Sequence, residues 1–292
     1  MTYEAFWQPL TRIYDTGEAK AVARMVMEMR FGLTMTDIIC GRTGDDEEMR
    51  IIQQRLLTGE PVQYVLGEAE FGERTFIVEP GVLIPRPETY ELCLWVIEES
   101  GEWRVERGEW REESGEWREK SGCSILDIGT GSGCIACTLA AAMPEAQVTA
   151  WDISDDALRI AAMNAERTSV NVAFRKVDVL NSPILNREEQ GFDIIVSNPP
   201  YICNKERVSM ERNVLEHEPH LALFVPDDDP LLFYRTIARY AVKTLNPGGR
   251  LFFEINPLYA NELLTMLSEE GFRNSEVRND QFGKQRFTQS WL

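Results

Sequence analysis

The segment Asp127-Ile-Gly-Thr-Gly-Ser-Gly has the residue types and spacing of a loop that binds a small ligand. Glycine lets the backbone turn sharply and lie close to a ligand, because no Cβ atom stands in the way. The segment begins with an acid, whose carboxylate can meet a cationic amino group directly or through water. The spacing is G-x-G-x-G rather than G-x-G-x-x-G, and no G-K-S/T follows, so a nucleoside triphosphate is not indicated. The predicted ligand-binding residues here are Asp127, Gly129, Thr130, Gly131, Ser132 and Gly133.

Two further acids follow predicted strands, at places suited to a bound adenosine. Asp152 ends the second strand about twenty residues beyond the glycine loop, where a carboxylate can accept hydrogen bonds from both ribose hydroxyls. The alternative for Asp152 is a helix N-cap, for which Ser154 and Asp155 are better placed. Asp178 follows the third strand and is predicted to accept from an adenine amino group, with Val179 beside the ring. A surface turn is the competing interpretation of Asp178.

A third motif, Asn198-Pro-Pro-Tyr, comes directly after a predicted strand at 192–197. Its two prolines restrict the backbone and offer no N–H, so the Asn198 side-chain oxygen and the Pro199 carbonyl can face one point. Two convergent acceptors suit a planar NH2 group, and the Tyr201 ring can stack on such a group. The motif therefore predicts a site for an amide or amine nitrogen, formed by Asn198, Pro199, Pro200 and Tyr201.

From residue 123 onward, predicted strands alternate with predicted helices. This alternation is typical of a mostly parallel sheet with helices on both faces. Because all three motifs follow strands, we expect them to meet at the carboxyl edge of the sheet, where doubly wound folds bind ligands. Strands are expected at 123–128, 147–152, 172–177, 192–197, 251–255, around 276 and at 286–291, and helices at 133–143, 155–166, 230–245 and 257–270.

The first part of the chain has a different pattern. Apolar residues repeat at helical spacing from residue 1 to about 65, which predicts a small helical bundle. Short extended stretches at 70–78 and 81–85 then predict a hairpin-like linker. We therefore expect three parts, a helical domain at 1–68, a hairpin linker at 69–87 and an α/β domain at 88–292.

Three imperfect copies of a seven-residue unit, each containing Gly-Glu-Trp-Arg, run from 100 to 120. A coiled coil is not favoured, because only one tryptophan in each copy is apolar at a regular place. Each glycine would cost roughly 1 kcal/mol inside a helix. The helix expected from residue 88 therefore ends near 99, and 100–120 is predicted to be a mobile insert. A partner site made by its tryptophans is the alternative to a tolerated loop expansion.

Composition limits the kinds of partner. The chain has 292 residues, 43% hydrophobic and 27% charged, as is usual for a globular protein. Its formal net charge of −18 disfavours direct nucleic-acid binding, since a phosphate backbone needs lysine and arginine contacts. The chain starts without a basic or apolar leader, so a cytoplasmic protein with no membrane partner is expected. No metal site is expected either, because Cys134 and Cys137 lie in an apolar helical run that favours burial.

Taken together, the glycine loop, Asp152 and the N-P-P-Y motif resemble the amino-methyltransferases with a class I fold, which include enzymes that act on DNA adenine and on protein glutamine. Further stretches are similar to the release factor glutamine methyltransferase family over nearly the whole chain. Two positions depart from the family pattern: Tyr90 replaces a usual acid after R-P-E-T, and Val179 stands where an aromatic residue is common. The similar stretches are 61–67 (P-V-Q-Y-V-L-G), 83–89 (L-I-P-R-P-E-T), 218–224 (E-P-H-L-A-L-F) and 233–238 (F-Y-R-T-I-A).

The resemblance implies a Rossmann-like, doubly wound, mostly parallel seven-stranded sheet and S-adenosylmethionine as cofactor. It also implies methyl transfer to the side-chain amide nitrogen (N5) of the glutamine in the Gly-Gly-Gln motif of class 1 peptide-chain release factors, which modulates translation termination. The helical domain at 1–68 would dock the release factor. Asn198, Pro199 and Tyr201 would be catalytic, and Asn198 would also contact the cofactor. The residues implied to bind substrate are Arg86, Pro87, Glu88, Asn198, Pro199, Pro200 and Tyr201.

Three alternatives remain at this point. A glutamine of a ribosomal protein would need the same motifs. DNA adenine methylation uses the same loop but conflicts with the net charge of −18. A non-enzymatic protein that binds S-adenosylmethionine and adheres through the tryptophan repeat would show binding without turnover.

Overall fold

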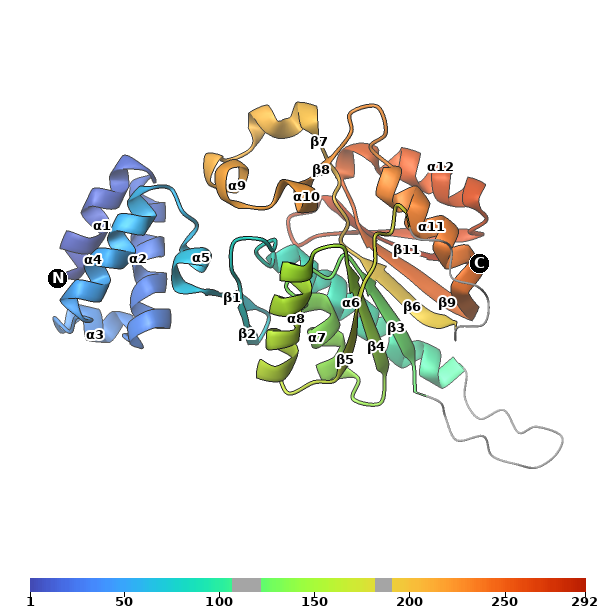
Figure 1. Cartoon of the computed structure of the whole chain (residues 1–292), viewed down its shortest axis with the longest axis horizontal. Helices are drawn as coiled ribbons and strands as arrows, with labels where there is room; N and C mark the ends of the chain where they lie inside the picture. Colours follow the sequence, from blue (N-terminus) through green and yellow to red (C-terminus); the bar gives the residue numbers. More distant parts are fainter. Residues whose placement is uncertain (107–121, 182–190) are drawn as a thin grey trace.

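The computed structural model describes residues 1–106, 122–181 and 191–292, with side chains up to Ser100 in the first of these ranges. A helical bundle lies at one end of the molecule and a larger body built on a sheet lies at the other (Figure 1). A short hairpin connects the two. The predicted repeat at 100–120 lies outside the described residues from 107 onward.

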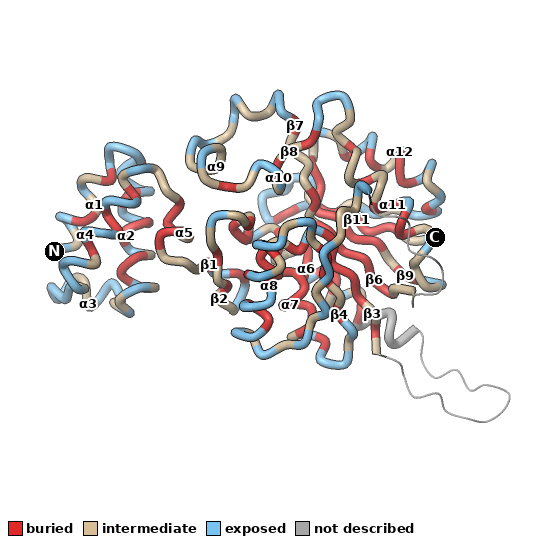
Figure 2. The backbone as a smooth tube through the Cα atoms, in the orientation of Figure 1, coloured by how far each residue is buried: buried red, intermediate tan, exposed pale blue. Residues whose placement is uncertain are grey.

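The bundle consists of six short helices whose apolar stripes face one another. Asp15, Thr34 and Asp45 each accept a backbone N–H at a helix start, which satisfies donors that have no partner inside the helix. Phe6 and Leu56 are among the fully buried residues of its own core. Figure 2 draws the buried stretches of the bundle in red. The helices are α1 (Tyr3–Trp7), η1 (Gln8–Arg12), α2 (Thr16–Phe31), α3 (Met35–Ile39), α4 (Asp46–Leu57) and α5 (Val62–Leu66).

The hairpin pairs β1 (Glu68–Phe71) with β2 (Arg74–Ile77) in antiparallel register. The predicted hairpin is confirmed, but the second extended stretch, at 81–85, forms no strand. The following helix, α6 (Pro87–Glu106), is longer than predicted and continues through the first copy of the repeat. At the predicted end of this helix Ser100 is buried, and its hydroxyl lies 3.2 Å from the Met143 sulfur at the end of the next helix along the chain.

The body is a seven-stranded sheet in the order β10-β11-β9-β6-β3-β4-β5. Five neighbouring strands are parallel to one another, namely β9, β6, β3, β4 and β5. The strands β11 and β10 are added antiparallel beside β9. The chain passes from β3 to β4 and β5 on one side, then returns to β6 on the other, so the order reverses at β3. The strands are β3 (Ser124–Ile128), β4 (Gln147–Asp152), β5 (Val172–Lys176), β6 (Phe192–Ser197), β9 (Leu245–Glu254), β10 (Asn274–Asn279) and β11 (Gln285–Trp291).

Helices cover both faces of this sheet, as predicted (Figure 1). One buried cluster joins α6 and α7 to the sheet, and a second joins α11 and α12 to its other face. The strand β9 begins six residues before the predicted strand, because Asn246 donates to Asp193 at 2.9 Å and holds the Asn-Pro-Gly-Gly stretch against β6. The helices are α7 (Cys134–Ala142), α8 (Asp155–Arg167), α11 (Leu232–Thr244), η3 (Pro257–Tyr259) and α12 (Ala260–Glu270).

A segment of short elements lies between β6 and α11, beyond the carboxyl edge of the sheet. It forms a small parallel two-stranded ladder, β7 with β8, and places α9 above the sheet on the side of the bundle (Figure 1). Its elements are β7 (Ile202–Cys203), η2 (Asn204–Ser209), α9 (Arg212–His217), α10 (His220–Leu223) and β8 (Phe224–Val225).

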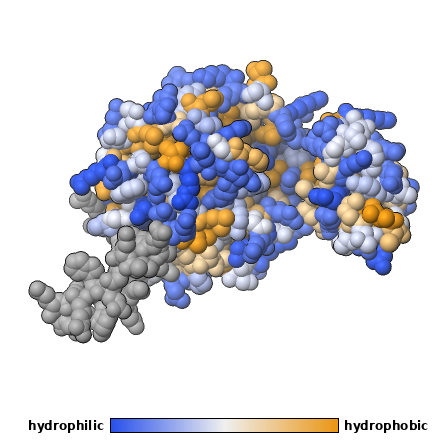
Figure 3. Space-filling model, turned by 180° about the vertical axis from the view of Figure 1, so that it is seen from behind, coloured by the Kyte–Doolittle hydropathy of each residue, from blue (hydrophilic) through white to orange (hydrophobic). Residues whose placement is uncertain are grey.

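The surface seen in Figure 3 is mostly hydrophilic, in agreement with the 27% of charged residues in the sequence. From behind, hydrophilic residues dominate the molecule and hydrophobic ones gather in separate patches (Figure 3). Within the described ranges, no helix has both the length and the apolar character needed to cross a bilayer.

One buried amide, Asn164 on α8, connects the hairpin to the glycine loop. Its Oδ1 accepts from the Ile77 N–H at 2.6 Å, and its Nδ2 donates to the carbonyls of Ile77 and Ser132, both at 2.9 Å. The side chain thus pairs with the edge of β2 as a neighbouring strand would. It therefore links the position of the hairpin to the position of the loop.

We expect Asn164→Ala to lower the free energy of unfolding by about 2 kcal/mol, because it removes the hydrogen-bond partner of backbone groups of the half-buried Ile77 and the buried Ser132. Urea unfolding followed by circular dichroism measures this. The exposed Asn171, just before β5, provides the control Asn171→Ala, which should change stability by no more than a few tenths of a kcal/mol. Equal stabilities for the two variants would contradict the structural role of Asn164.

Candidate active site

Two adjoining pockets open at the carboxyl edge of the sheet. The larger pocket has a volume of about 400 Å³ and is lined by residues that follow β3, β4, β5 and β6. The smaller pocket, of about 330 Å³, lies between 83–86, the residues after β6 and the segment around α9. Both are lined by Asn198 and Pro199, so these two residues stand where the pockets meet.

The glycine loop forms one wall of the larger pocket. Gly129, Gly131 and Gly133 have φ values of 75°, 55° and 79°, in the left-handed region that other residues rarely adopt. Gly133 is also required by packing, because a Cβ atom there would lie 2.9 Å from the Ala161 Cβ. Gly129 and Gly131 line the pocket, whereas Thr130, Ser132 and Gly133 do not. A ligand role for those three residues stays a prediction.

Asp152 lines the larger pocket at the end of β4. Its Oδ2 accepts from the Gly131 N–H and its Oδ1 from the Ser154 N–H, both at 2.9 Å. Burial raises the pKa of Asp152, although these hydrogen bonds oppose the shift. The alternative N-cap role is wrong, because the Ser154 hydroxyl caps α8. Each carboxylate oxygen keeps acceptor capacity for a further donor in the pocket.

Asp178 and Val179 also line the larger pocket. Both carboxylate oxygens of Asp178 are used within its own turn, since they accept from the Leu180 N–H at 3.0 Å and from the Asn181 amide at 2.6 Å. The competing interpretation, a turn, is therefore present in the structure. The proposed contact with an adenine amino group stays a prediction.

Asp127 is fully buried at the end of β3 and does not line either pocket. The Thr130 hydroxyl donates to Asp127 Oδ2 at 2.6 Å. No described residue makes a hydrogen bond of ordinary geometry to Asp127 Oδ1. Burial raises the pKa of Asp127 to about 7, against the effects of Thr130 and the Ala136 backbone N–H. A cation close to the glycine loop would stabilise its ionised form.

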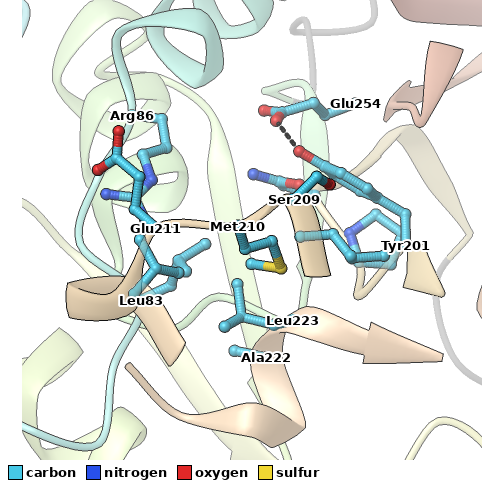
Figure 4. A pocket seen from close by; sticks show the side chains of 13 residues that line it. Leu83, Arg86, Tyr201, Ser209, Met210, Glu211, Ala222, Leu223 and Glu254 are labelled. Atoms are coloured by element: carbon cyan, nitrogen blue, oxygen red, sulfur yellow. Dashed lines mark hydrogen bonds between the residues drawn. The ribbon is translucent and has the colours of Figure 1, made fainter. Parts of the chain in front are cut away.

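The N-P-P-Y loop forms the wall between the pockets. Asn198 donates from Nδ2 to the Thr89 Oγ1 at 3.1 Å, so the amide oxygen is left for another partner. The Tyr201 hydroxyl donates to Glu254 Oε1 at 2.9 Å, drawn as a dashed line in Figure 4. Burial, and then the charge of Glu254, raise the pKa of Tyr201 well above its usual value. Tyr201 therefore acts as a neutral wall of the smaller pocket.

Arg86 lies on the opposite side of the smaller pocket from Tyr201, next to Glu211 (Figure 4). Its guanidinium donates to Glu218 Oε1 at 2.5 Å, and Glu218 Oε2 also accepts from the Ile84 N–H at 3.2 Å. Neither of the other two residues predicted from the R-P-E-T stretch lines a pocket: Pro87 is exposed and Glu88 is half-buried. Their role in binding substrate stays a prediction.

Sequence reasoning missed three polar residues of the site. Thr89 belongs to the quoted R-P-E-T stretch and Glu218 to the quoted E-P-H stretch, but neither was assigned a role. Glu254 had one usable signal, a carboxylate at the end of the apolar run Leu-Phe-Phe. The apolar wall of the larger pocket was also missed; it includes Leu83, Ile153, Leu180, Phe233 and Ile237.

Both cysteines of the C-x-x-C pair are buried in α7, and burial raises the pKa of each thiol to about 12. Such thiols stay protonated at neutral pH and are poor metal ligands. Over the described parts of the chain, no three His, Cys, Asp or Glu side chains cluster in a way that could hold a metal ion.

The fold and the glycine loop at its carboxyl edge can be compared with known proteins. Residues 117–221 match the family described as "Methyltransferase small domain". The solved catalytic domain of hMettl16 has the same fold, with a TM-score of 0.51 and 15% identity, covering 84% of this chain and 81% of that chain. The fold and the site thus define a class I S-adenosylmethionine-dependent methyltransferase.

Two curated relatives give a closer placement. The release factor glutamine methyltransferase of Bacteroides thetaiotaomicron is 43% identical to this chain, over 96% of this chain and 95% of its own length. The protein of the same name from Flavobacterium psychrophilum is 39% identical, over 96% of this chain and 94% of its own length. The chain belongs to the release factor glutamine methyltransferase family, and the resemblance noted from its motifs is confirmed.

The residues of the larger pocket fit S-adenosylmethionine. The left-handed glycines bring the backbone close to the pocket, and Asp152 offers carboxylate oxygens to ribose hydroxyls. Asp127 lies behind the loop and lines neither pocket, so its contact with the amino group of the cofactor stays a prediction. The volume of about 400 Å³ lies within the range usual for small-molecule sites.

Proposed function

We propose that this protein transfers a methyl group from S-adenosylmethionine to the side-chain amide nitrogen of the glutamine in the Gly-Gly-Gln motif of class 1 peptide-chain release factors. The observation that carries the proposal is the position of Asn198 and Pro199, which line both pockets. A glutamine amide that enters the smaller pocket would meet these two acceptors next to the cofactor pocket. Family membership supports the choice of substrate.

The chemistry needs positioning more than a strong base. An amide nitrogen is a poor nucleophile, because its lone pair is delocalised into the carbonyl. S-adenosylmethionine, when bound, supplies a methyl group on a positively charged sulfur that is already activated for transfer. The Asn198 oxygen and the Pro199 carbonyl would accept the two N–H bonds of the substrate, and one of these protons would pass to solvent as the methyl group is transferred. Acceptors placed for a pyramidal NH2 group bind the transition state better than the planar ground state, and this lowers the barrier.

The remaining residues would hold the two reactants. In the larger pocket we assign the ribose to Asp152, the adenine to Asp178 and Val179, and the amino-acid end of the cofactor to the glycine loop. In the smaller pocket Tyr201 would stack on the substrate amide, while Arg86 would contact the backbone of the release factor near the glutamine. Holding both groups in contact turns a bimolecular reaction into an effectively unimolecular one.

The helical bundle would dock the release factor away from the reacting glutamine. It has its own buried core, and it lies on the same side of the body as α9 (Figure 1). This helix contributes Val214 to the lining of the smaller pocket. Modification of a release factor modulates translation termination, a process of the cytoplasm, so a cytoplasmic location is part of this proposal. The net charge of −18 speaks against duplex DNA as the substrate.

Methyl transfer from labelled S-adenosylmethionine tests the proposal. Three acceptors are offered separately: a purified class 1 release factor, ribosomes and duplex DNA. We expect label only in the release factor, with an added methyl group on the Gly-Gly-Gln glutamine in mass spectra. A release factor with that glutamine changed to asparagine is the matched control and should stay unlabelled. Label in ribosomes or DNA instead would overturn the substrate assignment.

A further inference from the structure

Glu254 is an unusual residue at the end of β9. It is only 2% exposed, yet it carries a carboxylate that lies against the smaller pocket. Its Oε2 accepts from the Thr89 hydroxyl at 2.7 Å and its Oε1 from the Tyr201 hydroxyl at 2.9 Å. Tyr234 donates to the Glu254 carbonyl at 3.1 Å and so fixes the backbone at this point. Burying a carboxylate costs free energy unless hydrogen bonds compensate, so the partners of Glu254 indicate its role.

The hydrogen bonds around Thr89 have a fixed direction. A carboxylate only accepts, so the single hydrogen of the Thr89 hydroxyl must point to Glu254. The Thr89 oxygen can then only accept from Asn198, and it does so from Nδ2 at 3.1 Å. This places the NH2 end of the Asn198 amide toward Thr89 and its oxygen toward the opposite side.

We propose that Glu254 is a positioning residue that selects the orientation of the Asn198 amide through Thr89 and holds the Tyr201 ring directly. The inference rests on the proposed function, in which the Asn198 oxygen must face the substrate amide. Because Glu254 only accepts, the Thr89 hydrogen is donated to it. If the Asn198 amide were flipped, its oxygen would lie against the Thr89 oxygen, which has no hydrogen left to donate. That repulsion disfavours the flipped amide.

Glu254 itself is unsuited to act as a general base. Both of its oxygens already accept hydrogen bonds, from α6 and from the N-P-P-Y loop. Burial raises its pKa, while Thr89, Tyr201 and the charge of Arg286 on β11 oppose that shift. These three partners favour the ionised carboxylate and keep it in place. The chain of hydrogen bonds from Glu254 through Thr89 to Asn198, here called the relay, has a fixed direction when Glu254 only accepts.

Variants of Glu254 and Thr89 distinguish a role in orienting Asn198 from a role in stabilising the fold. Glu254→Gln introduces an NH2 donor that can reverse the direction of the hydrogen bonds in the relay. Thr89→Val removes the hydroxyl that links Glu254 to Asn198. We expect each change to lower the single-turnover rate of methyl transfer at saturating release factor and cofactor by about tenfold, the effect of one charge-assisted hydrogen bond. The dissociation constant for S-adenosylmethionine should stay within about twofold. Thr89→Ser keeps the hydroxyl and should restore the wild-type rate.

Two control variants match these changes in chemistry. Thr288→Val alters another buried threonine, whose hydroxyl has no partner among the described residues. Glu99→Gln alters another hydrogen-bonded carboxylate, which accepts from Trp95, Arg250 and Gln289 and lies outside both pockets. Both controls should transfer methyl groups at the wild-type rate. A wild-type rate for Glu254→Gln, or loss of rate in Thr89→Ser, would overturn the relay.

A double variant and a spectroscopic readout complete the test. If Thr89 carries the effect of Glu254, Glu254→Gln should add little to Thr89→Val, whereas independent roles would multiply the losses. The side-chain NH2 signals of Asn198 in ¹⁵N NMR spectra, assigned by their absence in Asn198→Ala, need no substrate. They should move in Glu254→Gln and Thr89→Val but not in Thr89→Ser. Unmoved signals would refute the relay even if the release factor proved not to be the substrate.

Discussion

Asn198→Ala is expected to slow methyl transfer to the release factor by about 10²- to 10³-fold, the usual effect of removing one preorganised polar group that acts on the transition state. The side chain lies between the two pockets and has its amide oxygen free of Thr89. Because the cofactor keeps its other contacts, the dissociation constant for S-adenosylmethionine should change little. Single-turnover kinetics with mass spectrometry of the Gly-Gly-Gln glutamine measure the rate and the modified residue together.

Two further variants make this result specific. Asn198→Asp keeps an acceptor oxygen but loses the NH2 group that donates to Thr89, so its rate should fall between those of wild type and Asn198→Ala. Asn274→Ala, at the exposed start of β10, is the matched control and should leave the rate unchanged. Transfer at the wild-type rate by Asn198→Ala would contradict the acceptor mechanism. A methyl group found on another type of residue would contradict the glutamine assignment.

Asp152→Ala should weaken the binding of S-adenosylmethionine by about 10²-fold. The carboxylate is proposed to accept from the ribose hydroxyls, and hydrogen bonds to a charged group contribute roughly 1.5 to 3 kcal/mol each, where 1.4 kcal/mol is tenfold in affinity. The variant also releases the Gly131 and Ser154 N–H groups that the carboxylate now holds. Isothermal titration calorimetry with S-adenosylmethionine measures the change directly.

The neighbouring Asp155 provides the control for charge. It is exposed at the start of α8, and its only ion pair in the described structure is with Lys176. Asp155→Ala should therefore leave the dissociation constant within about twofold, since an exposed ion pair contributes little. Asp152→Asn removes the charge but keeps one acceptor oxygen, and we expect a loss smaller than that of Asp152→Ala. Equal dissociation constants for wild type and Asp152→Ala would disprove the ribose assignment.

Sequence patterns predicted the parts of the fold that depend on local physics. The apolar runs that form β3, β4 and β6, and the helical stripe of the bundle, follow from the period of side chains along a strand or helix. The glycine loop was also predictable, because three positions with left-handed φ leave few alternatives to glycine. Prediction failed at the end of α6, which continues to Glu106 although a glycine inside a helix is locally unfavourable.

The sequence by itself determined the order of strands and helices, the glycine loop and the N-P-P-Y motif, since each is written in a few adjacent residues. Only the tertiary structure decided which polar groups share a buried space. Thr89 and Glu254 are 165 residues apart in the chain, and Arg86 and Glu218 are 132 apart, yet each pair is hydrogen-bonded. No local pattern encodes such pairs, because hydrogen bonds between distant residues depend on how the sheet and α6 bring their ends together.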